Sequence, residues 1–281
     1  MSLREVIATH TGRATSDGAG VSLTRVFGGA EPERFDPFLM LDEFGSDDPD
    51  QYIAGFPPHP HRGFETVTYM LEGRMRHEDH LGNVGLLESG AVQWMTAARG
   101  VIHSEMPQQE HGVMRGFQLW LNLPAKSKMK EPDYRDYAPQ DIPRIKLPNG
   151  VKVVVIAGTF SAEGIEQAGA VQRPDTEPQL FDLALPAGAD LSPDIPKGHR
   201  LLLYVYEGSL VVAGKTVDTR QLARLSDEGE LRLSSDTGAR VLLIAGRPIG
   251  EPIVQYGPFV MNSRDEIEQA LRDVRDGVFT S

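Results

Sequence analysis

The stretch Tyr69-Met-Leu-Glu-Gly-Arg-Met75 recurs 135 residues later as Tyr204-Val-Tyr-Glu-Gly-Ser-Leu210. Each copy is an apolar run that ends in Glu-Gly and continues into a second run, which is the pattern of two strands joined by a tight turn. The offset is close to half of the 281-residue chain, as a duplicated domain would give. The repeat therefore predicts two related all-β domains in tandem.

Short apolar runs separated by Gly and Pro continue this pattern along the chain. Examples are residues 38–41, 66–71, 117–123, 151–157, 201–206 and 241–245. Runs of this length, rich in Val, Leu and aromatic residues, are typical of strands in a sandwich or barrel.

The C-terminus alone has the features of a convincing helix. Ser263 and Glu266 form a capping box, and Gly277 is a stop signal. Apolar residues follow the cap at helical spacing: Ile267, Ala270, Leu271 and Val274. We expect this helix to pack against a sheet or another domain.

Residues 126–150 are rich in Pro, Asp and Lys and poor in apolar residues, which is the composition of a linker. A boundary near residue 140 divides the chain into an N-terminal domain, 1–140, and a C-terminal domain, 141–281, that ends in the helix.

The composition excludes several classes of protein. The formal net charge is −12, so the surface repels phosphate backbones and anionic lipids, and we expect no direct binding to nucleic acid or membrane. There is no cysteine, which rules out disulfides, thiolate metal sites and cysteine nucleophiles and fits a reducing cytosol. Residues 1–11 do not resemble a signal peptide, and no apolar run approaches the roughly 18 residues of a membrane helix. We expect a cytoplasmic protein.

Two short motifs bring metal-binding residue types together. In His59-Pro-His61 the imidazoles are two residues apart, so on a strand they project from one face. His103-Ser-Glu105 repeats this spacing with one carboxylate. On facing strands of a small barrel, the two pairs place three imidazoles and one carboxylate around one point. This nitrogen-rich, sulfur-free set suits a divalent first-row transition metal ion and leaves two octahedral positions for water, dioxygen or a chelating substrate.

Glu65 complicates this ligand list because it shares strand parity with His59 and His61. It is a further ligand, a hydrogen-bond acceptor behind the ligands, or a carboxylate in a turn. Four residues usually suffice for one ion, and Glu105 is the better-supported oxygen ligand.

The other histidines are predicted to lie outside the site. His77 and His80 fall in a polar stretch after the Glu-Gly turn and are interpreted as solvated or hydrogen-bonded loop residues. Three isolated histidines receive no role: His10, His111 and His199.

The histidine motifs belong to a longer series. It consists of His59-Pro-His-Arg-Gly-Phe-Glu-Thr-Val67, Glu72-Gly-Arg-Met-Arg-His-Glu-Asp79, Gln93-Trp-Met-Thr-Ala97, Arg99-Gly100, His103-Ser-Glu-Met-Pro107, Phe35-Asp-Pro-Phe38, Leu41-Asp-Glu-Phe44 and Tyr256-Gly-Pro-Phe-Val-Met-Asn262. With these motifs, dense over residues 35–124 and spread over nearly the whole chain, the sequence resembles the pirin family of the cupin superfamily.

The resemblance implies two tandem cupin barrels, or double-stranded β-helices, with one mononuclear iron in the N-terminal barrel. Carried over by motif, the iron ligands are His59, His61, His103 and Glu105. Glu65 stands where many other cupins have a ligand, but pirin-like proteins are described without that ligation. We expect one divalent transition metal ion per chain, with Fe(II) favoured and Mn, Co, Ni, Cu and Zn as alternatives.

The second copy of the repeat lacks these ligands. An offset of 135 places Asp194, Pro196 and Arg200 at the positions of the two histidines and the glutamate of the first motif. No histidine follows His199, so no later His-x-Glu pair exists. The C-terminal domain is therefore predicted to bind no metal.

Bacterial pirin-like proteins resemble quercetin 2,3-dioxygenases, which implies an oxidoreductase that cleaves a flavonol-like aromatic substrate with O2. Binding of the substrate and dioxygen at one ion converts a bimolecular encounter into an oriented one. Glu105 is the candidate catalytic base, because a carboxylate beside a cation can alternate between ligation and proton acceptance. Candidate pocket residues are Phe44, Phe56, Met70 and Trp120.

Two alternatives remain open at this point. The animal member of the family is known as an iron-dependent transcriptional co-regulator, which implies a non-enzymatic, iron-responsive protein whose acidic surface selects a basic protein partner. A cupin isomerase acting on a sugar fits the same ligands. Quercetin turnover that chelation abolishes would favour the dioxygenase.

Overall fold

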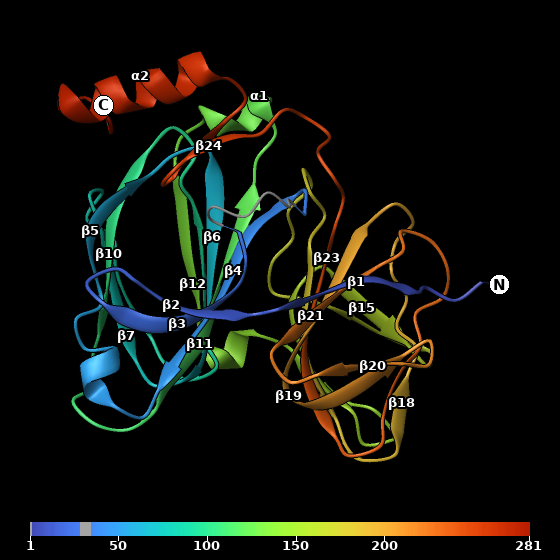
Figure 1. The fold of residues 1–281 in the computed structure, drawn as a ribbon. Coiled ribbons are helices and arrows are strands. Elements are labelled where there is room, and N and C mark those ends of the chain that lie inside the picture. Colours follow the sequence, from blue (N-terminus) through green and yellow to red (C-terminus); the bar gives the residue numbers. More distant parts are fainter. Residues whose placement is uncertain (1, 29–34) are drawn as a thin grey trace. The chain divides into compact units, whose positions relative to one another are not determined.

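The computed structural model describes residues 2–28 and 35–281, and strands dominate it (Figure 1). The chain divides into two compact units. The histidine unit comprises Arg13–Pro139 and Ile249–Ser281, and the second unit comprises Met1–Gly12 and Gln140–Pro248. Strands throughout and a long C-terminal helix confirm the predicted all-β fold class.

The histidine unit contains a seven-stranded and a four-stranded sheet. The first has the order β12 (Asp133–Tyr137), β9 (Val92–Thr96), β6 (Phe64–Glu72), β11 (Met114–Asn122), β4 (Phe38–Ser46), β3 (Val21–Phe27) and β2 (Arg13–Asp17). The second has the order β5 (Phe56–His61), β10 (Val101–Pro107), β7 (Met75–Asp79) and β8 (Val84–Leu87). The remaining elements are the 3-10 turn η1 (Pro49–Gln51), the helix α1 (Ala125–Lys128), the hairpin strands β24 (Val254–Tyr256) and β25 (Phe259–Met261), and the helix α2 (Arg264–Arg275).

An apolar core joins the two sheets of the histidine unit. Phe44 and Met70 of the larger sheet and Met75 and Leu87 of the smaller sheet belong to one buried cluster. Along β7 and β8 these side chains alternate with more exposed ones, because successive strand residues point to opposite faces. Each Å² of buried apolar surface contributes about 25 cal/mol, so the barrel has a source of stability independent of any metal ion.

The second unit is built in the same way. Its main sheet has the order β1 (Val6–Thr11), β21 (Gln221–Leu225), β19 (Arg200–Val212), β23 (Ala239–Gly246), β17 (Gln179–Leu185), β14 (Lys152–Ala157) and β13 (Arg144–Lys146). The other elements are β18 (Ala189–Leu191), β22 (Leu233–Ser235), β20 (Lys215–Asp218), the hairpin β15 (Thr159–Ala162) and β16 (Ile165–Ala168), and the 3-10 turn η2 (Pro139–Asp141) at the start of the unit. Alternate residues of β19, among them Leu201, Leu203 and Val205, are fully buried in its core.

The two units repeat one strand order. The series β9-β6-β11-β4-β3-β2 corresponds to β21-β19-β23-β17-β14-β13. β6 and β19, which carry the repeated motif, occupy equivalent places. Gly73 directly follows β6 and Gly208 lies within β19, and both have the left-handed φ that favours glycine, +95° and +70°. The topology thus contains the duplication that the sequence repeat predicts.

The two units do not coincide with the predicted domains, 1–140 and 141–281, because the first 12 residues lie in the second unit and the last 33 lie in the histidine unit. β1 precedes the histidine unit in the sequence but pairs with β21. Conversely, β12 precedes the second unit and pairs with β9. Residues 249–281 return to the histidine unit, where Phe259 forms a β-bridge with Arg62. Residues 126–150, predicted to be a linker, contain β12 and β13.

The C-terminal helix has the expected cap. Ser263 is the N-cap, and its hydroxyl accepts a hydrogen bond from the Glu266 backbone N–H at 3.3 Å. Ile267 and Ala270 are buried against a cluster that includes residues of β25. Leu271 and Val274, which share this helical spacing, are instead 40% and 43% exposed, because the helix buries a narrower stripe than its apolar pattern suggests.

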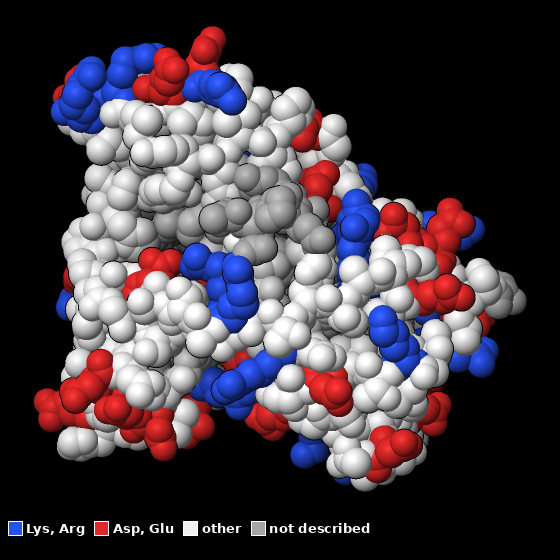
Figure 2. Space-filling model, viewed as in Figure 1, with Lys and Arg blue, Asp and Glu red and all other residues white. Residues whose placement is uncertain are grey.

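Charged side chains of both signs are scattered over the visible face of the molecule. On the face shown in Figure 2, Lys and Arg side chains lie among Asp and Glu side chains. Within the described residues, no helix has the length and apolar character needed to cross a membrane.

Candidate metal centre

β5 and β10 bring the three predicted histidine ligands together. The strands pair antiparallel, with His103 opposite His59. His61 lies two residues beyond His59 on β5, and side chains two apart on a strand share a face. All three imidazoles therefore project from one face of the four-stranded sheet.

An irregularity in this pairing sets the position of Glu105. The register shifts after His103, so Glu105 is opposite Phe56. The extra residue falls in Pro57-Pro58, where the backbone has no N–H to donate to the ladder.

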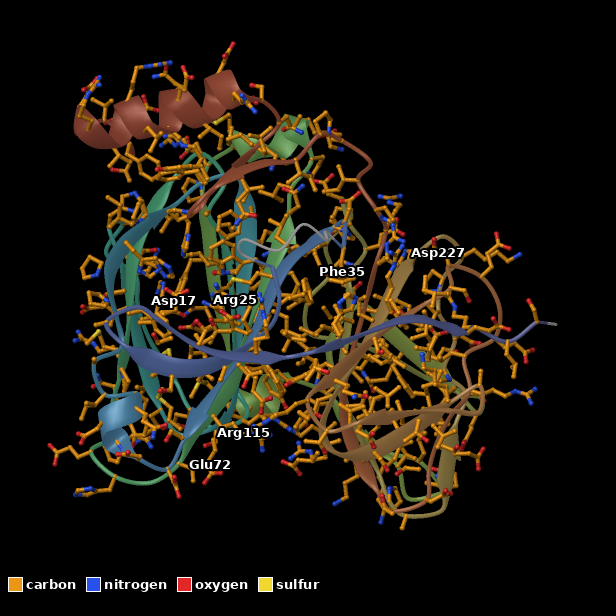
Figure 3. All side chains as sticks on the ribbon, in the orientation of Figure 1. Asp17, Arg25, Phe35, Glu72, Arg115 and Asp227 are labelled. Carbon is orange, nitrogen blue, oxygen red and sulfur yellow. The ribbon has the colours of Figure 1, made fainter. Side chains whose placement is uncertain are left out.

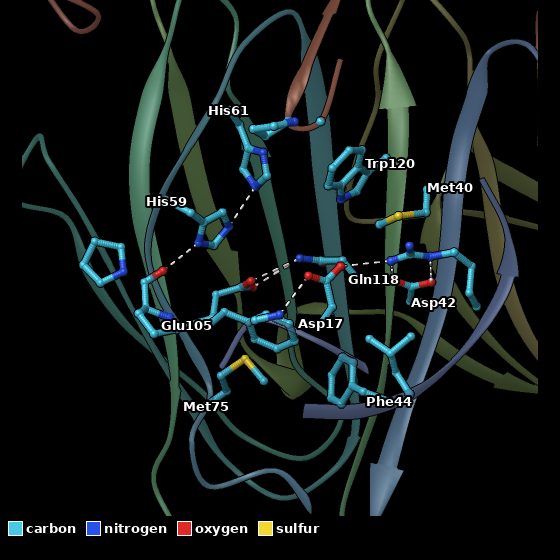
Figure 4. Close-up of a pocket in the computed structure, with 18 of the residues that line it drawn as sticks. Asp17, Met40, Asp42, Phe44, His59, His61, Met75, Glu105, Gln118 and Trp120 are labelled. Carbon is cyan, nitrogen blue, oxygen red and sulfur yellow. Dashed lines mark hydrogen bonds and ion pairs between the residues drawn. The ribbon is translucent and has the colours of Figure 1, made fainter. Parts of the chain in front are cut away.

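The three imidazoles form a compact cluster, and Figure 4 shows two of them, His59 and His61. One nitrogen from each of His59, His61 and His103 lies within 4.8 Å of the others. His59 Nε2 and His61 Nε2 are 3.0 Å apart, and the ring centroids of His59 and His103 are 4.4 Å apart. Within residues 2–28 and 35–281, no other group of three His, Cys, Asp or Glu side chains has such spacing.

Hydrogen bonds leave lone pairs directed at this cluster. His59 Nδ1 donates to the Pro57 carbonyl at 2.8 Å, so Nε2 of the neutral ring keeps its lone pair. His103 Nδ1 lies 2.8 Å from His77 Nε2, and His103 Nε2 is buried without a hydrogen-bond partner. A cation at the cluster gives His103 Nε2 a partner. The residues present therefore fit a divalent transition metal ion.

Burial keeps the inner imidazoles neutral. Desolvation, followed by the charge of His59, holds the pKa of His61 well below its usual value, and the Pro258 carbonyl offsets this in part. Desolvation and the neighbouring imidazoles likewise hold the pKa of His103 well below its usual value. A neutral imidazole has the free lone pair that a metal ion needs.

Glu105 lies at the edge of the cluster and is not a member of the three-histidine group. Its side chain is buried, with Gln118 Nε2 donating to Oε2 at 3.2 Å and Thr68 Oγ1 3.0 Å from Oε1. Burial raises the pKa of the Glu105 carboxyl, while the charge of His59 and these two hydrogen bonds lower it. The structure thus gathers the three histidines and holds the predicted base beside them.

Glu65 is likewise not a member of the three-histidine group. It sits on β6, is buried, and accepts a 2.6 Å hydrogen bond from Thr96 Oγ1. Glu65 thus accepts a hydrogen bond, as one of the alternatives to metal ligation in the sequence analysis expects.

His77 contacts one of the three histidines, which the sequence analysis missed. It was interpreted as a loop residue, but it lies on β7, is fully buried, and stacks on Tyr134 at a centroid distance of 4.7 Å. Burial lowers the pKa of His77 to about 4. Its Nε2 can therefore accept the Nδ1–H of His103 and fix the orientation of that ring. The signal was the alternation Met75-Arg-His77, which places His77 on the buried face.

The cluster opens into a cavity of about 770 Å³ within the histidine unit. Its apolar lining consists of Leu23, Met40, Phe44, Phe56, Met75 and Trp120, with several prolines. Three of the four predicted wall residues therefore line it. The fourth, Met70, is instead fully buried in the apolar core.

The C-terminal hairpin contributes the rim of this cavity, through Tyr256 and Pro258. Arg62 holds it in place, since its N–H donates to the Pro258 carbonyl and its carbonyl accepts from Val260 N–H. The Arg62 guanidinium also pairs with Asp273 of α2 at 2.6 Å. Because Arg62 directly follows His61, these contacts fix the backbone next to one of the three histidines.

Comparison with known proteins places this geometry in a family. The family profile described as Pirin matches residues 20–121, and that described as Pirin C-terminal cupin domain matches residues 180–280. The chain belongs to the pirin family. The first match contains all four predicted metal ligands, and the second contains the hairpin at the rim of the cavity.

Several known proteins are similar to this chain over at least 98% of its length. A protein of Pseudomonas aeruginosa named "Putative quercetin 2,3-dioxygenase" is 68% identical, over 98% of both chains. The "Pirin-like protein" of Caulobacter vibrioides is 48% identical, over 99% of this chain and 100% of its own. The crystal structure of quercetin 2,3-dioxygenase from Acinetobacter baumannii has a TM-score of 0.91 at 34% identity and covers 100% of this chain and 99% of its own.

Proposed function

We propose that this pirin family protein is a metal-dependent dioxygenase that cleaves quercetin or a related flavonol with O2. The observation that carries the proposal is the histidine cluster at one end of a largely apolar cavity, with the buried carboxylate of Glu105 beside it. A cavity of this size accommodates a small aromatic molecule. The names of the relatives from P. aeruginosa and A. baumannii support the same reaction class.

We propose Fe(II) as the ion, held by His59, His61 and His103 with Glu105 as the fourth ligand. Mn, Co, Ni, Cu and Zn ions suit the same nitrogen and oxygen donors, so metal analysis decides among them. When bound, the ion supplies Lewis acidity and the chemistry of dioxygen activation.

The side chains of this protein prepare the substrate. A Glu105 carboxylate oxygen accepts the proton of the substrate hydroxyl that approaches the cluster, and the Gln118 amide keeps the carboxylate oriented. Trp120 and Phe56 offer aromatic surface to the rings of the substrate and exclude water from the reacting end.

The test is turnover of quercetin by protein purified without an affinity resin and then loaded with Fe(II). We expect oxygen uptake and carbon monoxide release in proportion to bound metal, with loss of both after chelation and recovery after reloading. Absence of turnover by metal-replete protein across a panel of flavonols would contradict the proposal and favour the regulatory binding protein.

A further inference from the structure

The cavity has a second polar site, which the proposed chemistry does not use. Arg25 on β3 binds Asp42 on β4 through two hydrogen bonds, Nε to Oδ1 at 2.9 Å and Nη2 to Oδ2 at 2.8 Å. Arg25 Nη2 also donates to Asp17 Oδ2 at 3.0 Å. All three residues line the cavity; Figure 3 labels Asp17 and Arg25, and Figure 4 labels Asp17 and Asp42.

A tight turn holds Asp17 in this position. The Gly18 N–H donates to Asp17 Oδ1 at 2.8 Å, and the Ala19 N–H donates to the Gly55 carbonyl at 3.0 Å. Gly18 has φ of +60°, and a Cβ there would come within 2.5 Å of the Phe56 ring. The turn is thus packed against the wall of the cavity, and Asp17 stands at a defined place on its rim.

The charge of this second site decides what it can bind. Two carboxylates and one guanidinium leave one net negative charge, and Arg25 already uses Nε and Nη2 on aspartates. An anionic group is therefore repelled. Asp42 is buried, whereas the Asp17 side chain is 55% exposed, so a carboxylate acceptor remains accessible to a hydrogen-bond donor.

Apolar side chains line the cavity near these two polar sites. Leu23 and Met40 belong to the same strands as Arg25 and Asp42, and Trp120 lies next to His61, with ring centroids 5.2 Å apart. In the view of Figure 4, His59 and His61 are on one side, Asp42 is on the other, and Asp17 lies between them. This arrangement suits a flat aromatic molecule with polar groups at both ends.

We propose that Asp17, positioned by Arg25, accepts hydrogen bonds from hydroxyl groups on the ring of the substrate that is not anchored at the histidine cluster. It makes the protein selective for aromatic substrates hydroxylated at both ends. The inference rests on the proposed function for the anchoring of the substrate at the histidines. It adds the residue that determines specificity at the far ring.

The test compares three flavonols that differ only in that ring: quercetin with two hydroxyl groups, kaempferol with one and galangin with none. Binding to the metal-loaded chain is measured under argon through quenching of tryptophan fluorescence, since Trp120 lines the cavity. Without oxygen, binding is observed separately from turnover. We expect the wild type to prefer quercetin to kaempferol and kaempferol to galangin.

Asp17→Ala should weaken quercetin binding by about 10-fold or more, as loss of a hydrogen bond to a charged group does, and leave galangin within about two-fold. Asp47→Ala is the matched control, because Asp47 is exposed and does not line the cavity. Melting curves establish that each variant is folded.

Equal weakening of quercetin and galangin by Asp17→Ala, or equal binding of the three flavonols by the wild type, would overturn the inference. In air, the same variants report KM for each flavonol. Selective binding that depends on Asp17, without turnover of any flavonol, would contradict the proposed function and leave the subsite intact.

Discussion

At the scale of single residues, the two ring nitrogens of His103 have different surroundings. Its Nδ1 lies 2.8 Å from His77 Nε2, and its Nε2 is buried without a hydrogen-bond partner. The buried, neutral His77 therefore acts as the acceptor that orients this ring.

His77→Phe should weaken metal affinity by about 10- to 100-fold, as loss of an outer-shell partner typically does. Phenylalanine can retain the stacking on Tyr134 but cannot accept the proton of His103. The measurement is competition for the metal against a chelator of known affinity. His80→Phe is the control, because His80 is not part of the histidine cluster and its Nδ1 accepts a hydrogen bond from the Ile102 N–H. Unchanged affinity in His77→Phe would remove its positioning role.

His59→Ala and His103→Ala should each lose the metal and remain folded. The apolar core provides most of the stability, while metal binding adds RT ln(1 + [L]/Kd), a few kcal/mol with metal in excess. Metal content and circular dichroism of the purified variants check both parts. Glu65→Gln should keep its metal. Full occupancy in either histidine variant removes that residue from the ligand list.

Glu105→Gln should reduce turnover more than metal content. The amide oxygen can still coordinate weakly, but it cannot accept a proton near neutral pH, and loss of a general base costs about 10²–10⁴ in rate. Quercetin consumption and carbon monoxide release are measured per bound metal. Equal rates for variant and wild type would leave Glu105 as a ligand without a role in proton transfer.

At the scale of elements, the short helix α1 is tied to its surroundings through the buried Lys128. Its Nζ donates to the Gly63 carbonyl at 2.7 Å, to Asn122 Oδ1 at 2.6 Å and to the Val260 carbonyl at 2.9 Å. These bonds join α1 to β11, to β25 and to the turn that follows His61. Burial lowers the pKa of Lys128 to about 7, although nearby carboxylates oppose the shift.

The stability of the wild type relative to Lys128→Met should rise between pH 7 and about 10.5. In that range the unfolded chain, whose lysine titrates near 10.5, binds the proton that the folded chain has released, so higher pH favours folding. At pH 7 the variant should be less stable by about 2 kcal/mol or more, because buried acceptors lose their donor. Urea unfolding at several pH values tests this, with the exposed Lys130→Met as control. Identical pH slopes for the two variants and the wild type would contradict it.

At the scale of the whole molecule, the second unit repeats the strands of the metal centre without their ligands. β22 pairs with β18 and β19, as β10 pairs with β5 and β7. Three buried residues on β18 and β22, Ala189, Leu191 and Leu233, belong to an apolar core, and the buried Ser235 donates to the Ser209 carbonyl. The constant offset of 135 points instead to Asp194 and Pro196, which follow β18, because the loops of the two copies differ in length.

We therefore expect one metal equivalent per chain. Titration of metal-free protein, followed by elemental analysis after gel filtration, should give a single tight site, and His59→Ala should abolish it without exposing another. Two equivalents bound with similar affinity would show that the second unit also holds an ion.

The sequence predicted well the relations between residues that are close together in the chain. His59 with His61 and His103 with Glu105 share strand faces because the pleat repeats every two residues, a rule that needs no knowledge of the neighbouring strands. The C-terminal cap and the all-β class follow from equally local patterns. The resemblance to the pirin family added a prediction that local patterns do not give, namely that the two histidine segments contribute to one metal site.

Contacts between distant segments were decided by the tertiary structure alone. Strand pairing brings His77 to His103, and packing of the β2–β3 turn on Phe56 puts Asp17 beside Arg25. The return of residues 249–281 to the histidine unit likewise depends on the buried Arg62 and its partner Asp273. A sequence pattern specifies which face a residue occupies. Which strand or loop lies opposite that face depends on burial and on pairing between segments far apart in the chain. The periodicity of a short stretch of sequence does not determine this pairing.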